Sequence, residues 1–130
     1  MNTKKLSSSF TISGRLQSLR HALRGLIILF SEEINARIHL LLGLIAVFLG
    51  VLCHINSTEW LLIAFSIGWV IFAETVNTAI ENLADIVCPD YNYKIGRIKD
   101  LAAAAVLIAA ITAALVGGIV FIPHLLNFIS

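Results

Sequence analysis

Long apolar stretches alternate with short polar breaks along this 130-residue chain. The pattern predicts three membrane-crossing helices, at residues 38–55, 60–87 and 101–126. These lengths lie near or above the ~20 residues that a helix needs to span a bilayer. Residues 56–59 form the polar break between the first two helices. Pro89, Asp90 and Gly96 favour a loop over residues 88–100 before the third helix.

Residues 9–33, ahead of the first crossing, have a different pattern. Apolar side chains recur there at spacings of three and four, whereas basic and amide side chains occupy another face: Leu16, Leu19, Leu23, Leu26, Ile27 and Phe30 against Gln17, Arg20, His21 and Arg24. This predicts an amphipathic helix on the membrane surface, with its cations near anionic headgroups. The simplest interpretation is that the helix serves only as an anchor.

Composition supports a membrane protein. The chain is 58% hydrophobic and 13% charged, with a mean hydropathy of +0.92, whereas a typical soluble domain is about 25% charged. This excludes an ordinary cytosolic globule and a disordered chain. A net charge of +1 argues against nucleic-acid binding, and two cysteines are too few for a disulfide framework. We therefore expect one all-α integral membrane domain over residues 1–130.

The basic residues predict the orientation. Six of the nine precede the first crossing and three lie in the 88–100 loop, whereas the 56–59 break and the C-terminus have none. Basic segments mark the cytoplasmic side of a membrane protein. We therefore expect a multi-pass protein of the bacterial cytoplasmic membrane, with the N-terminus and the 88–100 loop inside.

The second crossing carries polar residues on one helical face. They occur at i, i+3, i+4, i+7 and i+11: Glu74, Asn77, Thr78, Glu81 and Asp85. Glu74 and Glu81 are two turns apart, about 10 Å along the axis. A carboxylate within the hydrocarbon costs ~2.5–3.5 kcal/mol on insertion scales. A polar seam between helices would explain Asn77 and Thr78, but it explains three carboxylates poorly.

Further charged residues are expected on the same cytoplasmic side. Glu33 ends the surface helix, and Lys99 and Asp100 precede the third crossing. Carboxylates at a water boundary suit Mg²⁺, which keeps water and substrate phosphates as its other ligands, and basic side chains would complement those phosphates. The sequence has no P-loop, no kinase glycine loop and no zinc-ligand spacing.

Three motifs resemble the prokaryotic diacylglycerol kinases, which are small integral membrane lipid kinases. They are HALRGL at 21–26 leading to EEINARIH at 32–39, ETVNTAIE at 74–81 followed by Asp85, and KDLAAAAVLIAA at 99–110. The resemblance implies a homotrimer of three-crossing subunits with N-terminal surface helices. It also implies ATP-dependent phosphorylation of a lipid alcohol, at sites between neighbouring subunits that face the cytoplasm.

The resemblance further implies roles for individual residues. Glu74 matches the general base that meets the lipid hydroxyl, and Glu33 and Glu81 match the ligands of Mg²⁺ under the ATP phosphates. The implied nucleotide-binding residues are His21, Glu33, Glu81, Asp90, Tyr91, Asn92, Lys99 and Asp100. The implied lipid-binding residues are Glu74, Asn77 and Ala103. Asn92 stands where the family is expected to have His, and His21 stands where an aromatic ring is common in the enterobacterial branch.

Several functions stay open from the sequence. Conversion of diacylglycerol to phosphatidic acid is the first expectation. The run EEINARIH at 32–39 looks more like the branch that includes undecaprenol kinases. A small proton-coupled exporter could also use an intramembrane glutamate, although such exporters usually have four crossings. A purely structural subunit would not need Glu74.

Overall fold

The computed structural model describes residues 12–129, and it describes side chains as far as Asn127. The described part consists of four helices without a strand: α1 (Ile12–Glu32), α2 (Ile34–Leu52), α3 (Ser57–Val87) and α4 (Tyr93–Ile129). Three segments are long and apolar enough to cross a membrane: Ile34–Leu52, Ser57–Val87 and Tyr93–Asn127. The predicted all-α membrane fold is confirmed.

The chain divides into two compact units, Met1–Glu33 and Ile34–Ser130. The first contains α1, the predicted surface helix. Residues 9–11 of that prediction lie outside the described residues, and the described helix ends one residue earlier than expected. The backbone N–H of Glu33 donates to the carbonyl of Leu29 at 2.9 Å, which closes the last turn.

A tightly specified turn joins α2 to α3. The N–H of Ile55 donates to the carbonyl of Gly50 and that of His54 to the carbonyl of Val51, with His54 in the left-handed region at φ 49°. These are the bonds of a Schellman motif. Asn56 then caps α3, because its side chain accepts from the N–H groups of Thr58 and Glu59 while Glu59 accepts from the N–H of Asn56.

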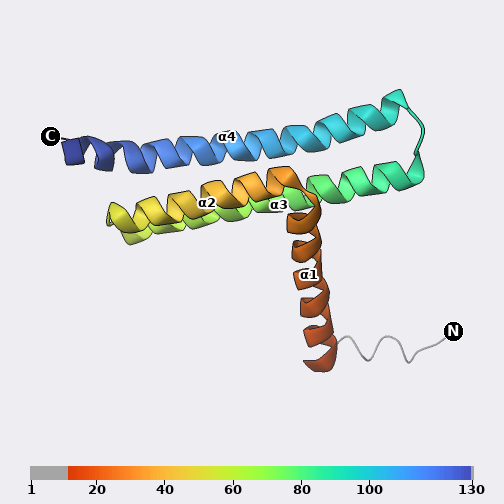
Figure 1. Cartoon of the computed structure of the whole chain (residues 1–130), viewed down its shortest axis with the longest axis horizontal. Helices are drawn as coiled ribbons and strands as arrows, with labels where there is room; N and C mark the ends of the chain where they lie inside the picture. Colours follow the sequence, from red (N-terminus) through yellow and green to blue (C-terminus); the bar gives the residue numbers. More distant parts are fainter. Residues whose placement is uncertain (1–11, 130) are drawn as a thin grey trace. The chain divides into compact units, whose positions relative to one another are not determined.

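In the second unit, α3 and α4 run side by side in opposite directions (Figure 1). A buried apolar cluster stabilises the pair near the α2–α3 turn: Ile55, Ile63, Val120 and Phe121. α2 also packs against α3. The approach is close at Gly50, where an added Cβ would lie 2.9 Å from Cη2 of Trp60. The α3–α4 connection, Cys88–Asn92, lies at the opposite end of the bundle.

The predicted start of the third crossing is wrong by eight residues. α4 begins at Tyr93 rather than at residue 101, so the expected loop shrinks to residues 88–92. The side chain of Asn92 accounts for this, because its Oδ1 accepts from the N–H groups of Lys94 at 2.9 Å and Ile95 at 3.4 Å. Such a side chain satisfies the free N–H groups of a first helical turn. Gly96 then lies inside the helix, where glycine costs only about 1 kcal/mol relative to alanine.

The other boundaries differ for related reasons. α2 begins at residue 34 rather than 38 and ends at residue 52 rather than 55, where the Schellman motif stops it. α3 begins at residue 57 rather than 60, because Asn56 provides the cap. Hydrophobic runs mark the part of a helix within lipid, whereas capping side chains decide where the helix ends.

Candidate functional site

The predicted polar stripe lies along one face of α3, with increasing exposure toward the α3–α4 connection. Glu74 and Thr78 are buried, with exposed fractions of 3% and 6%. Asn77 and Glu81 are half-buried, and Asp85 is exposed. The stripe therefore runs from the interior of the second unit to its surface.

Glu74 contacts a histidine on a different helix. Nε2 of His39, on α2, lies 3.3 Å from Oε1 of Glu74. The exposed fractions of the two side chains are 21% for His39 and 4% for Glu74. A carboxylate this buried needs a polar partner, because a lone charge in an apolar interior is costly. His39 lies in the motif at 32–39, but the sequence reasoning gave it no role.

Asn77 and Glu81 form a second polar group, one turn further along. Nδ2 of Asn77 donates to Oε1 of Glu81 at 3.2 Å. Oδ1 of Asn77 and Oγ1 of Thr78 are buried without a hydrogen-bond partner. Most buried polar atoms in proteins have a partner, so Asn77 retains an unused acceptor. Oε1 of Glu81 is used within the protein, and its carboxylate remains the kind of oxygen donor that Mg²⁺ prefers.

Lys99 joins α4 to the exposed end of the stripe. Its Nζ lies 2.9 Å from Oδ1 of Asp85, and the side chains are 34% and 66% exposed. Ion pairs this open to solvent are weak, so a phosphate oxygen could replace Asp85 as the partner of Lys99.

The other predicted nucleotide residues are more dispersed. Asp90 and Tyr91 are exposed in the α3–α4 connection, and Asp100 is exposed on α4. Asn92 is also exposed, but its side chain caps α4. The prediction that these residues contact a nucleotide stays untested.

The predicted magnesium ligands belong to separate units. Glu33 closes the first unit, which also contains the exposed His21, and Glu81 lies in the second. Over residues 12–129 the structure brings no three His, Cys, Asp or Glu side chains together as a metal site. Mg²⁺ needs only one or two protein carboxylates, because water and phosphates supply its other ligands. That Glu33 and Glu81 provide these carboxylates stays a prediction.

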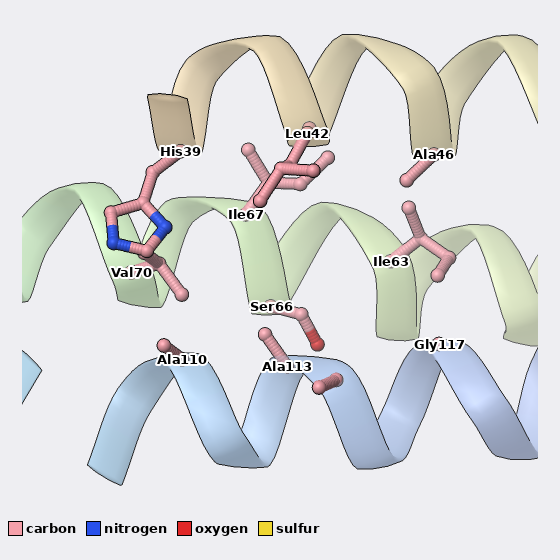
Figure 2. A pocket seen from close by; sticks show the side chains of 12 residues that line it. His39, Leu42, Ala46, Ile63, Ser66, Ile67, Val70, Ala110, Ala113 and Gly117 are labelled. Atoms are coloured by element: carbon pink, nitrogen blue, oxygen red, sulfur yellow. The ribbon is translucent and has the colours of Figure 1, made fainter. Parts of the chain in front are cut away.

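Two cavities lie in the second unit. The first, which we call the His39 cavity, has a volume of about 300 Å³ and lies among α2, α3 and α4. His39 and Ser66 are its polar lining residues, and Figure 2 shows the His39 ring at one end. The second, between α3 and α4, measures about 490 Å³, and Asn77 is its polar lining residue. Ala102 lines this second cavity, whereas Ala103, predicted to bind lipid, is exposed and does not.

These features define a class of protein: a small helical membrane protein with a partnered buried carboxylate beside apolar cavities. The family model for prokaryotic diacylglycerol kinase matches residues 20–121. The chain belongs to this family, as its motifs predicted.

Individual relatives carry two different names. The chain is 34% identical to a diacylglycerol kinase of Synechocystis over 86% of its own length and 65% of that protein. It is 30% identical to an undecaprenol kinase of Bacillus subtilis over 84% of its length and 89% of that protein. A diacylglycerol kinase of Escherichia coli is 33% identical over 62% of this chain and 66% of that protein. The chain thus spans slightly less than two thirds of the length of each of these two diacylglycerol kinases.

Proposed function

We propose that this protein is a membrane lipid kinase that transfers the γ-phosphate of ATP to the hydroxyl of a lipid alcohol. The observation that carries the proposal is the buried carboxylate of Glu74, held within a membrane-crossing helix and paired with His39. Family membership supports it. Neither a structural subunit nor a simple anchor would need this residue.

In the proposed mechanism, the residues of the stripe have different roles according to their depth in the membrane. Glu74, near the hydrocarbon boundary, serves as the general base for the lipid hydroxyl. Glu81 and Glu33 would hold Mg²⁺, which when bound neutralises charge on the ATP phosphates. Lys99 and Asp100 help to bind the nucleotide. Phosphoryl transfer depends mainly on positioning and charge stabilisation, which a rigid helix with side chains at fixed spacing can provide.

The preferred lipid is proposed to be diacylglycerol, with phosphatidic acid as the product. Undecaprenol is the second candidate, because the undecaprenol kinase of Bacillus subtilis matches this chain over 89% of its own length. Both lipids present a primary alcohol on an apolar body. The cavities are lined mainly by apolar side chains, which suits either.

We further propose a homotrimer in the bacterial cytoplasmic membrane with its sites facing the cytoplasm. The motif resemblance supports this assembly, and the basic residues support the orientation. Aromatic residues stacked along α3 are also exposed in the single chain: Phe65, Trp69 and Phe72. Large exposed apolar side chains within the membrane are available for contact with lipid or with other subunits.

The test is a phosphate-transfer assay with the full chain in mixed micelles, Mg²⁺ and radiolabelled ATP. Diacylglycerol and undecaprenol are supplied separately, and kcat/KM is measured for each. We expect labelled phosphatidic acid as the main product. A higher kcat/KM with undecaprenol would change the substrate but keep the kinase, whereas transfer to neither lipid would refute the proposal. Proton-coupled export by reconstituted protein would then favour the transporter alternative.

A further inference from the structure

His39 contacts the proposed general base, but the mechanism above gives it no role. We propose that His39 is a positioning residue of the lipid kinase reaction: its Nε2–H holds the Glu74 carboxylate in the orientation in which that carboxylate accepts the proton of the lipid hydroxyl. Glu74 remains the general base, and the lipid remains at the proposed site between subunits. The inference rests on the proposed lipid kinase function and deepens it.

The contact between the two side chains is the first argument. Nε2 of His39 lies 3.3 Å from Oε1 of Glu74, and an ionised carboxylate can only accept hydrogen bonds. Nε2 must therefore carry a hydrogen when Glu74 is ionised, which is the state that a general base needs. The donated hydrogen bond offsets part of the cost of burying the charge, and it restricts rotation of the carboxylate about its last bond.

The burial of Glu74 makes the orientation of its carboxylate important. The side chain is only 4% exposed, so a substrate hydroxyl can approach it from a narrow range of directions. A general base must come within hydrogen-bond reach of the proton that it abstracts, and a misplacement of about 1 Å can reduce the rate about 100-fold. A donor fixed on a neighbouring helix prevents such a misplacement.

The close packing of α2 on α3 is the second argument. A Cβ added at Gly50 would lie 2.9 Å from Cη2 of Trp60, and one added at Gly43 would lie 3.2 Å from Cγ2 of Ile67. Small residues let helices in a membrane approach each other this closely. From the first contact to the second, the position falls by seven residues on α2 and rises by seven on α3, as in an antiparallel pair with a heptad seam.

One further step of seven along this seam leads to the site. It reaches Ala36 on α2, which is 0% exposed, and Glu74 on α3. His39 lies three residues after Ala36 and four before Gly43, and residues at these spacings are neighbours on one helix face. Figure 2 shows the His39 ring extending from α2 toward α3. The packing that fixes the register of the two helices therefore also fixes the donor beside Glu74.

A second histidine–glutamate contact offers a structural comparison. At the opposite end of α3, Nε2 of His124 lies 3.1 Å from Oε1 of Glu59, and the two side chains are 30% and 22% exposed. This contact also joins two helices, α3 and α4, but it has no part in the proposed reaction. If His39 were purely structural, substitutions of the two histidines would act alike: both would lower the free energy of unfolding, and neither would change kcat of the folded enzyme.

The step that His39 supports balances as follows. The lipid oxygen forms a bond to the γ-phosphorus of ATP, while the bond from that phosphorus to the β–γ bridging oxygen breaks and its electron pair leaves with ADP. The hydroxyl proton moves to the Glu74 carboxylate and is later released to water. His39 keeps its own hydrogen on Nε2 throughout, so it neither gains nor loses a proton.

The main test compares three variants of the full chain in the mixed-micelle assay. His39→Leu removes the donor, and we expect kcat to fall about 10- to 100-fold, the range typical of groups that orient a functional side chain. The KM values for ATP and lipid should stay within about threefold of wild type. His39→Gln places an amide N–H near the position of Nε2–H and should recover kcat to within about fivefold of wild type. His124→Leu is the matched control and should keep the wild-type kcat.

Three results of this comparison would overturn the proposal. They are a wild-type kcat in His39→Leu, a loss in His39→Gln as large as that in His39→Leu, and a loss in His124→Leu as large as that in His39→Leu. If His39→Leu does not fold, His39→Asn takes its place, because its amide is one methylene shorter than that of Gln and does not reach Glu74. Its kcat should fall about 10- to 100-fold, and a kcat equal to that of His39→Gln would overturn the proposal.

A double-mutant cycle tests whether His39 acts through Glu74. Substitutions of two residues that act as one unit are not additive. In the Glu74→Gln background, His39→Leu should therefore lower kcat less than about threefold further. A further loss as large as the one in the wild-type background would show that His39 acts independently of Glu74, against the proposal.

Failure of the inference is distinguishable from failure of the proposed function. A wild-type protein that phosphorylates neither lipid would refute both. An active wild type with an equally active His39→Leu variant would leave the lipid kinase intact and remove only the positioning role of His39.

Discussion

The two glutamates of the α3 stripe should respond differently to the same substitution. Glu74 is buried against His39, whereas Glu81 is half-buried beside Asn77 and two turns nearer the helix end. Glu74→Gln preserves size and a side-chain oxygen but removes the charge that supports proton transfer. We expect kcat to fall about 10²- to 10⁴-fold, which corresponds to roughly 3–5 kcal/mol of activation free energy. The affinity for Mg-ATP should stay close to that of wild type.

Glu81→Gln should have the opposite profile. In the native protein Nδ2 of Asn77 donates to Oε1 of Glu81 at 3.2 Å. The amide oxygen of Gln can accept the same hydrogen bond, so the local structure should persist. The negative charge proposed to hold Mg²⁺ is lost. Removal of groups that only support metal ligands costs about 10- to 100-fold in metal affinity, and a direct ligand should cost at least as much. We therefore expect the affinity for Mg-ATP to fall by this factor or more.

The assay pairs two measurements on each purified variant: calorimetric affinity for Mg-ATP, and the phosphorylation rate with saturating lipid. Glu59→Gln is a suitable control on the same helix. Glu59 lies at the opposite end of α3, where it contacts the N–H of Asn56 and, at 3.1 Å, Nε2 of His124. The Glu59→Gln substitution makes the same chemical change far from the site, so its Mg-ATP affinity and its phosphorylation rate should both match those of wild type.

Two results would refute this reasoning. Equal losses of Mg-ATP affinity in Glu74→Gln and Glu81→Gln would make Glu74 a metal ligand or a determinant of folding. Near-normal turnover of Glu74→Gln would show that phosphoryl transfer here needs no carboxylate at this position.

Three further predictions follow from local contacts. Asn92→Ala should lower the free energy of unfolding by about 1 kcal/mol in detergent, because α4 loses its cap; Asn92→Asp should be nearly neutral, and an unchanged Asn92→Ala would contradict the cap. His54→Gly should raise the free energy of unfolding by about 1 kcal/mol, because a non-glycine residue at φ 49° is strained. A lower free energy of unfolding in this variant would contradict the strain. Asp85→Asn should tighten ATP binding about 1.5- to 5-fold by releasing Lys99, as calorimetry can test, whereas weaker binding would place Asp85 within the nucleotide site.

The crossings and the stripe could be predicted because the hydrocarbon of a bilayer requires long apolar helices, in which polar residues are easily recognised. In a chain this apolar, a run of about 20 apolar residues has few alternatives to a membrane-crossing helix. Residues at i, i+3, i+4 and i+7 share a face in any regular α-helix, so Glu74 and Glu81 could be placed relative to each other before the fold was known. The family could also be identified, because its motifs retain their order and spacing along the chain.

The contact between Glu74 and His39 could not be predicted in the same way. It joins α2 to α3, and periodicity within one helix contains no information about the register between two helices. The sequence does offer one signal, since His39 is the one residue among Asp, Glu, Lys, Arg and His between Arg37 and His54. A polar side chain there needs a partner, and the deepest carboxylate of the next helix is a reasonable candidate.

Asn92 illustrates a different limit. Asparagine favours turns and helix caps for the same reason, because its short side chain hydrogen-bonds to nearby backbone N–H groups. With Pro89 and Gly96 on either side, the sequence pattern indicated a longer loop. Only the bonds from Lys94 and Ile95 to Oδ1 show that the side chain starts a helix. A cap position also explains Asn92 without any nucleotide.

The length of α3 connects the burial of its carboxylates to their proposed chemistry. Its 31 residues extend for about 46 Å at a rise of 1.5 Å per residue, whereas the hydrocarbon core of a bilayer is about 30 Å thick. If α3 enters the membrane near its capped start, roughly its last ten residues extend beyond the hydrocarbon. Glu81 and Asp85 then lie where water and phosphates are available, and Glu74 lies just inside, where a lipid hydroxyl can reach. A single rigid helix thus holds the proposed metal ligand and the proposed proton-transfer site about 10 Å apart across this boundary, which a mobile loop could not do.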